Sequence, residues 1–179
     1  MSGAWQLLVP WPDAAVPDRV LVAARVRREG AVLVLGWKVE DVRGCVSVPE
    51  AAPIGARRDG LWEATCFEAF LAGENGPGYL EINVAPSGDW QCYGFSGYRE
   101  GRLVLPEATA PELRLVRTTA SLELEARFSA GLEALGPQPW RVGLTAVIED
   151  RAGSLSYWAL AHTGPEPDFH RADSWSSAV

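Results

Sequence analysis

The sequence predicts an all-β protein in which antiparallel strands form a sandwich or a barrel. Apolar and polar residues alternate with a period of two along much of the chain, as they do in strands that bury one face. Short turn signals separate these segments, which is typical of strands that follow one another closely. No series of helical segments lies between the strands, and this argues against the parallel sheet of an α/β fold.

Nine segments carry the strand pattern. The clearest is Ser121–Phe128, in which Leu122, Leu124 and Ala126 alternate with polar residues and would form the buried face of a strand. The remaining strands are expected at 20–27, 31–39, 65–72, 79–85, 90–96, 113–118, 141–149 and 155–162.

Glycine, proline and small polar residues mark the turns between these strands, at 28–30, 73–78, 86–89, 100–101 and 151–153. At most one or two short helical segments are expected. The candidate is 129–135, where Ser129 would cap the helix and Gly136 would end it. The segment 163–179 has no clear period, and we expect it to wrap across the sheets with Phe169 and Trp175 as anchors.

Composition limits the function. The chain has 179 residues with 16 basic and 23 acidic side chains, so its formal net charge is −7. This length predicts a single domain that spans residues 1–179. The acidic balance and the scattered arginines argue against binding to nucleic acid or to an anionic membrane surface. With 47% hydrophobic residues, the chain is expected to fold rather than stay disordered.

Targeting and redox signals favour the cytoplasm. No run of residues approaches the roughly 20 apolar positions of a transmembrane helix, and residues 1–12 lack the charged start and long apolar centre of a secretory signal. Cys45, Cys66 and Cys92 are widely spaced without a C-x-x-C pattern, which is typical of reduced thiols rather than a disulfide or zinc framework. We therefore expect a cytoplasmic protein.

A candidate ligand site lies on two neighbouring strands. Alternation places Glu68 on one face of its strand, and it places Glu81 and Asn83 on one face of the next. If these strands pair, two carboxylates and an amide meet on a sheet surface and could bind a polar ligand. The alternative is a solvated sheet face without a ligand.

Aromatic residues flank this candidate site. Trp62 precedes the first strand, Trp90 and Tyr93 follow the second, and Trp158 shares a strand face with His162. Aromatic rings are flat and rigid, so they can stack on the C–H face of a sugar while polar groups bind its hydroxyls. Most Trp residues in a sandwich are buried packing residues, however, and we expect about two or three of the eight to contact a ligand.

Three segments resemble DOMON-like proteins related to family 9 carbohydrate-binding modules. They are LWEATCFEAFL at 61–71, YLEINVAPSGDW at 79–90, and SYWALAH at 156–162 with PDFH at 167–170. The resemblance covers most of the chain after residue 57. It implies a jelly-roll-like β-sandwich that binds a ligand, usually a sugar and in some branches haem.

The resemblance also assigns roles to residues. Sugar-binding modules of that family hold the end of the ligand between two Trp rings, which Trp62 and Trp158 would supply. Glu68 would be the acidic partner and Asn83 the amide. Glu81 stands where the family has an Arg, so this chain loses a donor there and gains an acid. Arg58 and Arg99 could compensate from adjoining loops.

Haem and metal are the less favoured interpretations. Electron-transfer members of the haem branch use an axial Met, and the only Met here is the first residue. His162 and His170 could form a bis-His pair, but their spacing is not diagnostic, so no cofactor is expected. Asp168, His170 and Asp173 form too weak a set for a metal site.

Two other function classes remain open. Glu68 and Glu81 could form the carboxylate pair of a glycoside-processing enzyme, although no hydrolase elbow, phosphate-binding loop, dinucleotide or zinc motif occurs. A Trp-rich face could instead bind another protein. We predict non-catalytic binding of a small, carbohydrate-like ligand, without a prediction of oligomeric state. The candidate ligand-binding residues are Trp62, Glu68, Glu81, Asn83, Trp158, Arg58, Arg99, Trp90, Tyr93 and His162.

Overall fold

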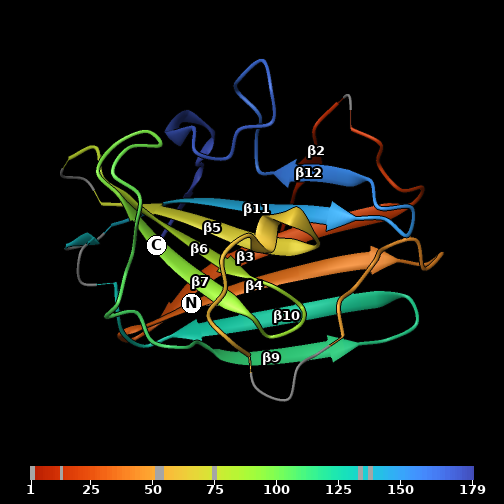
Figure 1. The fold of residues 1–179 in the computed structure, drawn as a ribbon, viewed down its shortest axis with the longest axis horizontal. Coiled ribbons are helices and arrows are strands. Elements are labelled where there is room, and N and C mark those ends of the chain that lie inside the picture. The colour runs from red at the N-terminus through yellow and green to blue at the C-terminus, as the bar shows by residue number, and fades with distance from the viewer. Residues whose placement is uncertain (1–2, 13, 51–54, 74–75, 133–134, 137–138) are drawn as a thin grey trace.

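Two antiparallel sheets pack face to face in the computed structural model (Figure 1). The structure describes residues 3–12, 14–50, 55–73, 76–132, 135–136 and 139–179. The prediction of an all-β, antiparallel sandwich is confirmed. Among the described residues, no helix has the length and hydropathy needed to cross a bilayer.

The smaller sheet has five strands in the order β1-β3-β4-β10-β9. Its two long strands β3 and β4 form a hairpin, and β10 pairs with β4 along its whole length. Strict alternation of buried and half-buried residues along β10 shows the pattern that the sequence predicts. The strands are β1 (Gln6–Leu7), β3 (Val20–Glu29), β4 (Val32–Asp41), β9 (Glu112–Arg117) and β10 (Ser121–Phe128).

The larger sheet has eight strands in the order β2-β12-β11-β5-β6-β7-β8, and β13 pairs with β11 beside this path. Among the described residues, two short 3-10 turns lie between its strands in sequence: η1 (Leu61–Glu63) just before β5 and η3 (Ala172–Ser174) just before β13. The strands are β2 (Val9–Pro10), β5 (Cys66–Ala72), β6 (Tyr79–Val84), β7 (Trp90–Phe95), β8 (Leu103–Val104), β11 (Arg141–Glu149), β12 (Leu155–Ala159) and β13 (Ser177–Ala178).

All nine predicted strands are present, with ends shifted by up to three residues. The strands β1, β2, β8 and β13 were not predicted, because each has only two residues and so cannot show an alternating pattern of apolar and polar residues. The helical turn expected at 129–135 includes residues 133–134, which lie outside the described residues. On either side of them, the backbone N–H of Leu135 donates to the carbonyl oxygen of Leu132.

The main core fills the space between the sheets. Trp37 of β4 stacks on Phe67 of β5 with 5.6 Å between ring centroids, and its indole N–H donates to the backbone oxygen of Thr145 on β11. This contact joins the two sheets through rings without leaving a buried donor unpaired. The core is therefore one continuous cluster of side chains from both sheets.

A second apolar cluster lies on the outer face of the larger sheet, under the C-terminal segment that is dark blue in Figure 1. Trp175 packs on Phe70 of β5, and its indole N–H donates to the carbonyl oxygen of Phe169. Gly143 of β11 makes this possible, because a Cβ there would lie 2.2 Å from Trp175 Cδ1. The prediction that Phe169 and Trp175 anchor this segment is confirmed.

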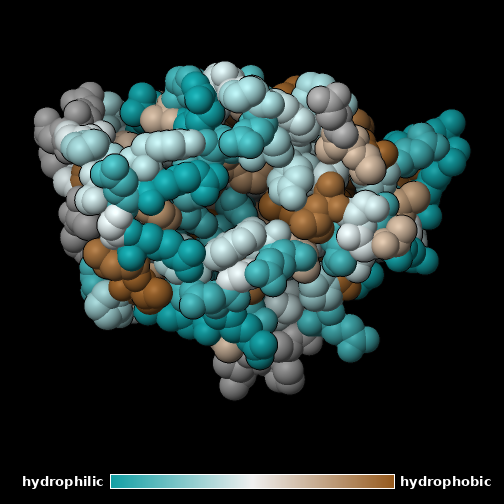
Figure 2. Space-filling model, turned by 45° about the horizontal axis from the view of Figure 1, so that its top comes forward, coloured by the Kyte–Doolittle hydropathy of each residue, from teal (hydrophilic) through white to brown (hydrophobic). Residues whose placement is uncertain are grey.

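The surface is mostly polar on the face shown in Figure 2. Hydrophilic residues cover most of that face, and apolar residues form small, separate patches. A stable protein–protein interface normally has a larger, continuous apolar centre. The visible part of this face therefore gives no support to the protein-binding alternative.

Candidate functional site

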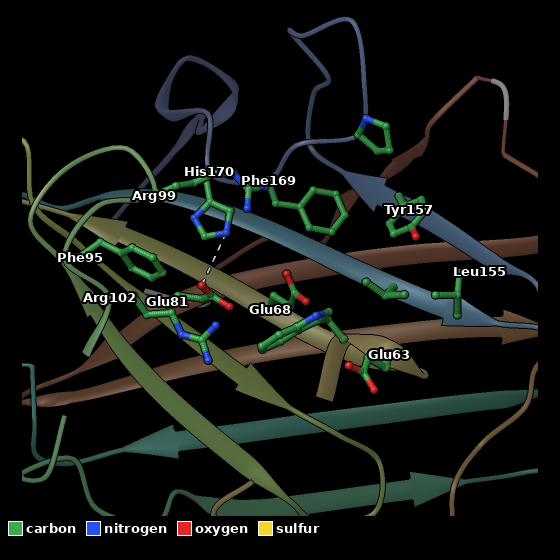
Figure 3. A pocket seen from close by; sticks show the side chains of 13 residues that line it. Glu63, Glu68, Glu81, Phe95, Arg99, Arg102, Leu155, Tyr157, Phe169 and His170 are labelled. Carbon is green, nitrogen blue, oxygen red and sulfur yellow. Dashed lines mark ion pairs between the residues drawn. The ribbon is translucent and has the colours of Figure 1, made fainter. Parts of the chain in front are cut away.

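A cavity of about 450 Å³ opens on the outer face of the larger sheet (Figure 3). We call it the outer-face pocket. Its lining comes from η1, five strands of the sheet, the turn after β7 and the C-terminal segment. The lining residues are Trp62, Glu63, Glu68, Glu81, Phe95, Arg99, Arg102, Val147, Leu155, Tyr157, Pro167, Phe169 and His170.

The floor of the pocket carries the two predicted carboxyl groups. Glu68 on β5 and Glu81 on β6 are only 4% and 6% exposed, and Figure 3 shows them side by side in the middle of the pocket. Asn83 is the cross-strand partner of Glu68, and its Nδ2 donates to Glu81 Oε1 at 2.7 Å. The structure thus brings together the three side chains that alternation predicts on one face.

Burial makes these carboxyl groups unequal. Burial raises the pKa of Glu68 well above its usual range, and the nearby charge of Glu81 raises it further. The pKa of Glu81 is also raised by burial, but the hydrogen bond from Asn83 and the charges of Arg102 and Arg99 oppose the rise. The ionised form of Glu81 is therefore better stabilised than that of Glu68. Glu68 holds its proton to a higher pH than an exposed Glu would.

One wall of the pocket is aromatic. Trp62 is half-buried in η1 and contacts the edge of the Tyr93 ring, with centroids 6.2 Å apart. The guanidinium of Arg102 lies 4.2 Å from the Tyr93 centroid and 5.3 Å from that of Trp62. Tyr93 is fully buried, and its O–H donates to Asp59 Oδ1 at 2.5 Å. The buried Tyr93 ring thus supports the indole of Trp62 on the side away from solvent.

The C-terminal segment forms the opposite side of the pocket through His170. The oxygen of Tyr79 accepts the backbone N–H of Arg99 at 3.1 Å and lies 2.7 Å from His170 Nδ1. If Tyr79 donates to Nδ1, the imidazole proton sits on Nε2, which is 3.7 Å from Glu81 Oε2. Burial lowers the pKa of His170 to about 4, so the ring is neutral at pH 7.

Asp168 attaches this segment to the sheet. Its carboxylate accepts hydrogen bonds from Arg99 Nη2 at 2.7 Å and from the backbone N–H of His170 at 3.1 Å. The hydroxyl of Tyr98 also donates to Asp168. Arg99, one of the predicted residues, therefore both lines the pocket and holds the segment that covers it.

Three predicted aromatic residues do not line the pocket: Tyr93, which is buried against Trp62, and Trp158 and Trp90. Trp158 is 2% exposed and lies in the core between the sheets, where its indole N–H donates to Ser156 Oγ at 2.9 Å. The prediction that it faces Trp62 is wrong, because the register of β12 turns Trp158 inwards. Trp90 is also a core residue, and the guanidinium of Arg57 lies 4.6 Å from its ring centroid.

Two predicted polar residues also lie elsewhere. Arg58 is exposed and forms an ion pair with Asp89 at 3.3 Å, outside the lining of the pocket. His162 Nε2 lies 3.0 Å from the carbonyl oxygen of Val9, and its ring meets Trp11 edge-on. Both side chains stabilise connections at the edges of the sheet, so their predicted contact with a ligand has no support in the geometry.

Several pocket residues were not predicted. Leu155 and Tyr157 of β12 lie on the face opposite Trp158, and that face is the pocket. Phe169 and His170 reach the site only because the C-terminal segment folds back over the sheet. Alternation along β12 could have indicated Tyr157, but no local pattern indicates which segment covers a sheet.

The described residues contain no group of three or more His, Cys, Asp or Glu side chains arranged to hold a metal ion. His162 and His170, the two candidates for haem ligands, both have hydrogen-bond contacts within the protein. Their placement therefore offers no support for a bis-His site.

The fold is an all-β sandwich, and a cavity of about 450 Å³ lies on one outer sheet face. Solved structures of similar fold include a candidate carbohydrate-binding protein from Bacteroides uniformis, with 17% sequence identity, coverage of 97% of this chain and 84% of that chain, and a TM-score of 0.69. At identities this low, the similarity shows the fold.

A family 9 carbohydrate-binding module from Caldicellulosiruptor kristjanssonii has been solved with cellotriose and with glucose. Each complex matches 88% of this chain at 10% identity, covers 72% or 74% of the module's chain, and has a TM-score of 0.51. No family model and no curated protein matches the chain.

Proposed function

We propose that this protein binds a small saccharide in the outer-face pocket and does not transform it. The observation that carries the proposal is the placement of the Trp62 ring and the carboxyl groups of Glu68 and Glu81 in one cavity. An indole offers an apolar plane to the C–H groups of a sugar ring, and buried carboxyl groups accept hydrogen bonds from its hydroxyls. No cofactor is needed for this function.

Two further observations support the proposal. The volume of about 450 Å³ is within the usual range for small-ligand sites, and the fold is similar to those of carbohydrate-binding modules. We also propose the more distant DOMON-like relation, on the segments 61–71, 79–90 and 156–162. Tyr157, rather than Trp158, is the residue of the third segment that lines the pocket.

Binding without hydrolysis fits the positions of the carboxyl groups. Glycoside hydrolysis normally needs two carboxyl groups that flank the scissile bond. Glu68 and Glu81 lie on adjacent strands and on the same face of the sheet, so both approach a ligand from the floor. We expect no release of reducing sugar when the protein is incubated with oligosaccharides, and measurable turnover that is lost in Glu81→Gln would contradict this.

Intrinsic fluorescence and calorimetry with a panel of mono- and disaccharides test the binding itself. We expect Trp62→Ala to weaken binding by about tenfold or more, since it removes the stacking plane. The matched control is Trp158→Phe, which changes a core Trp outside the pocket and should leave the affinity within about twofold. Failure of every sugar in the panel to bind the native protein would reject the proposed function.

A further inference from the structure

The floor of the outer-face pocket has buried carboxyl groups without a fixed cation beside them. Among the described residues, no Arg, Lys or His nitrogen lies within ion-pair distance of the Glu68 carboxyl group. For Glu81, the one such group in the described part of the chain is His170, with Nε2 at 3.7 Å, and that ring is neutral at pH 7. Buried acids are normally paired with a cation, and the described residues place no charged cation within ion-pair distance of these two.

The two arginines on the wall are engaged by other acids. Arg99 Nη2 is 2.7 Å from Asp168 Oδ1, and Arg102 Nη2 is 3.6 Å from Asp59 Oδ1. Arg102 also lies over the ring of Tyr93. Their charges act on Glu81 from a distance, but neither arginine donates a hydrogen bond to the floor.

Asn83 does not line the pocket, but it lies beside the two acids and has an unpaired acceptor. Its Nδ2 donates to Glu81 Oε1, while its Oδ1 is buried and has no hydrogen-bond partner among the described residues. Asn83 is fully buried on the same sheet face as both acids, directly across from Glu68. An unsatisfied buried acceptor costs free energy. Glu81 accepts one hydrogen bond from Asn83, and Glu68 has one with the side chain of Thr145, so the remaining acceptor positions of the two carboxyl groups are open to donors from a ligand.

We propose that the ligand of this pocket is a saccharide that carries a primary ammonium group, with the ammonium placed against Glu68 and Glu81 and the sugar ring against Trp62. This inference rests on the proposed function and specifies its ligand class. An ammonium brings three donors and a positive charge, whereas a hydroxyl brings one donor and no charge. The aromatic wall also attracts a cation through the faces of its rings.

Proton release distinguishes this ligand from a neutral sugar. The titratable and charged groups that face Glu68 are Cys66 on its own strand, Glu81 on β6, Glu63 in η1, Arg99 and Arg102 after β7, and His170 in the C-terminal segment. A bound ammonium favours the ionised form of Glu68, so binding releases a proton and tightens as the pH rises. A neutral sugar that accepts a hydrogen bond from protonated Glu68 gives the opposite trend.

The test is isothermal titration calorimetry of the full chain with glucosamine, glucose and N-acetylglucosamine at about pH 6.5, in two buffers of different ionisation enthalpy. We expect glucosamine to bind at least about tenfold more tightly than the other two, with proton release, as for a charge-assisted contact. Equal affinities, or a preference for a neutral sugar, would overturn the inference and leave the proposed function standing. Failure of all three sugars and of the wider panel would reject both.

Variants of the two acids test whether the preference for glucosamine arises from Glu68 and Glu81. Glu68→Gln should reduce the glucosamine preference to about onefold and also weaken glucose binding, because Glu68 belongs to the sugar site. Glu81→Gln should likewise lower the preference. The control is Glu112→Gln, the same charge change at an exposed residue of the other sheet, which should keep the native preference. Cooperative thermal unfolding confirms that each variant is folded. Glu68→Gln and Glu81→Gln proteins that both keep the tenfold preference would overturn the assignment.

Discussion

At the scale of single residues, Glu68 is a buried acid on the floor of a cavity, only 4% exposed. Burial and the nearby Glu81 raise its pKa, so its charged form is disfavoured in the folded state. Such a group lowers stability at neutral pH, and sites that bind ligands commonly retain this kind of strain. Burying ionised Glu68 therefore costs more free energy in the free protein than in a complex whose ligand donates hydrogen bonds to it.

The pH dependence of stability tests this view of Glu68. Below about pH 4.5, its unperturbed value, Glu68 is protonated in both the folded and the unfolded chain and contributes nothing. As the pH rises further, the unfolded chain ionises first, so stability falls until the pH passes the folded-state pKa. Glu68→Gln removes this loss, which amounts to about 1.4 kcal/mol per unit of pKa shift.

Thermal unfolding of the native protein and Glu68→Gln between pH 4 and pH 8 provides the measurement. We expect the variant to gain in melting temperature relative to the native protein as the pH increases above about 4.5. Glu112→Gln, at an exposed site, should show a nearly constant difference. A constant difference for Glu68→Gln as well would mean that the carboxyl group is not disfavoured by burial.

At the scale of elements, the strands were predictable and the cover of the pocket was not. Alternation is a local property, so β10 could be recognised from Ser121–Phe128 alone. Along β12 both faces are apolar, with Trp158 on one and Tyr157 on the other, so the pattern could not tell which face is the core. The register in which β12 pairs with β11 determines which face points to the core. That register depends on strands far away in the sequence.

The C-terminal segment shows the same limit. Phe169 and His170 belong to the site because Trp175 and Asp168 fasten their segment to the larger sheet. The contacts that tie the segment to the rest of the protein join residues far apart in the chain, such as Arg99 and Asp168, which are 69 positions apart. The anchoring role of Trp175 followed from its size and apolarity, but the cavity beneath the segment depends on the assembled fold.

Gly143→Ala tests whether the fit of this segment determines binding. The added Cβ would lie 2.2 Å from Trp175 Cδ1, so the indole and the carbonyl of Phe169 that it holds must move. We expect a loss of about 1–3 kcal/mol in the free energy of unfolding and at least severalfold weaker sugar binding, measured by denaturant unfolding and calorimetry.

The control for this substitution is Gly97→Ala, where an added Cβ would meet the side chain of Glu100 at 3.4 Å, an ordinary contact. It should change stability by less than about 1 kcal/mol. If Gly143→Ala left both stability and affinity unchanged, the packing of Trp175 against β11 would not control the pocket.

At the scale of the whole molecule, the outer-face pocket joins parts of the chain that are distant in sequence. Its lining runs from Trp62 in η1 through β5, β6 and β12 to His170 near the C-terminus. The floor belongs to central strands of the larger sheet, and the opposite side of those strands is the main core. A ligand bound here therefore contacts the central strands of the larger sheet as well as η1 and the C-terminal segment.

This arrangement predicts that a bound sugar stabilises the protein against global unfolding. A ligand at 100 times its Kd adds about 2.7 kcal/mol when it binds only the folded state, which corresponds to a rise of roughly 5–10 °C in Tm for a chain of this size. Differential scanning calorimetry with increasing glucosamine should show a single transition that moves upwards with ligand concentration. Trp62→Ala, tested at the same concentrations, should show a smaller shift because its affinity is lower. A native protein that binds the sugar in calorimetric titration while its Tm stays constant would show that the ligand sits on a surface that persists after unfolding, and not in the outer-face pocket.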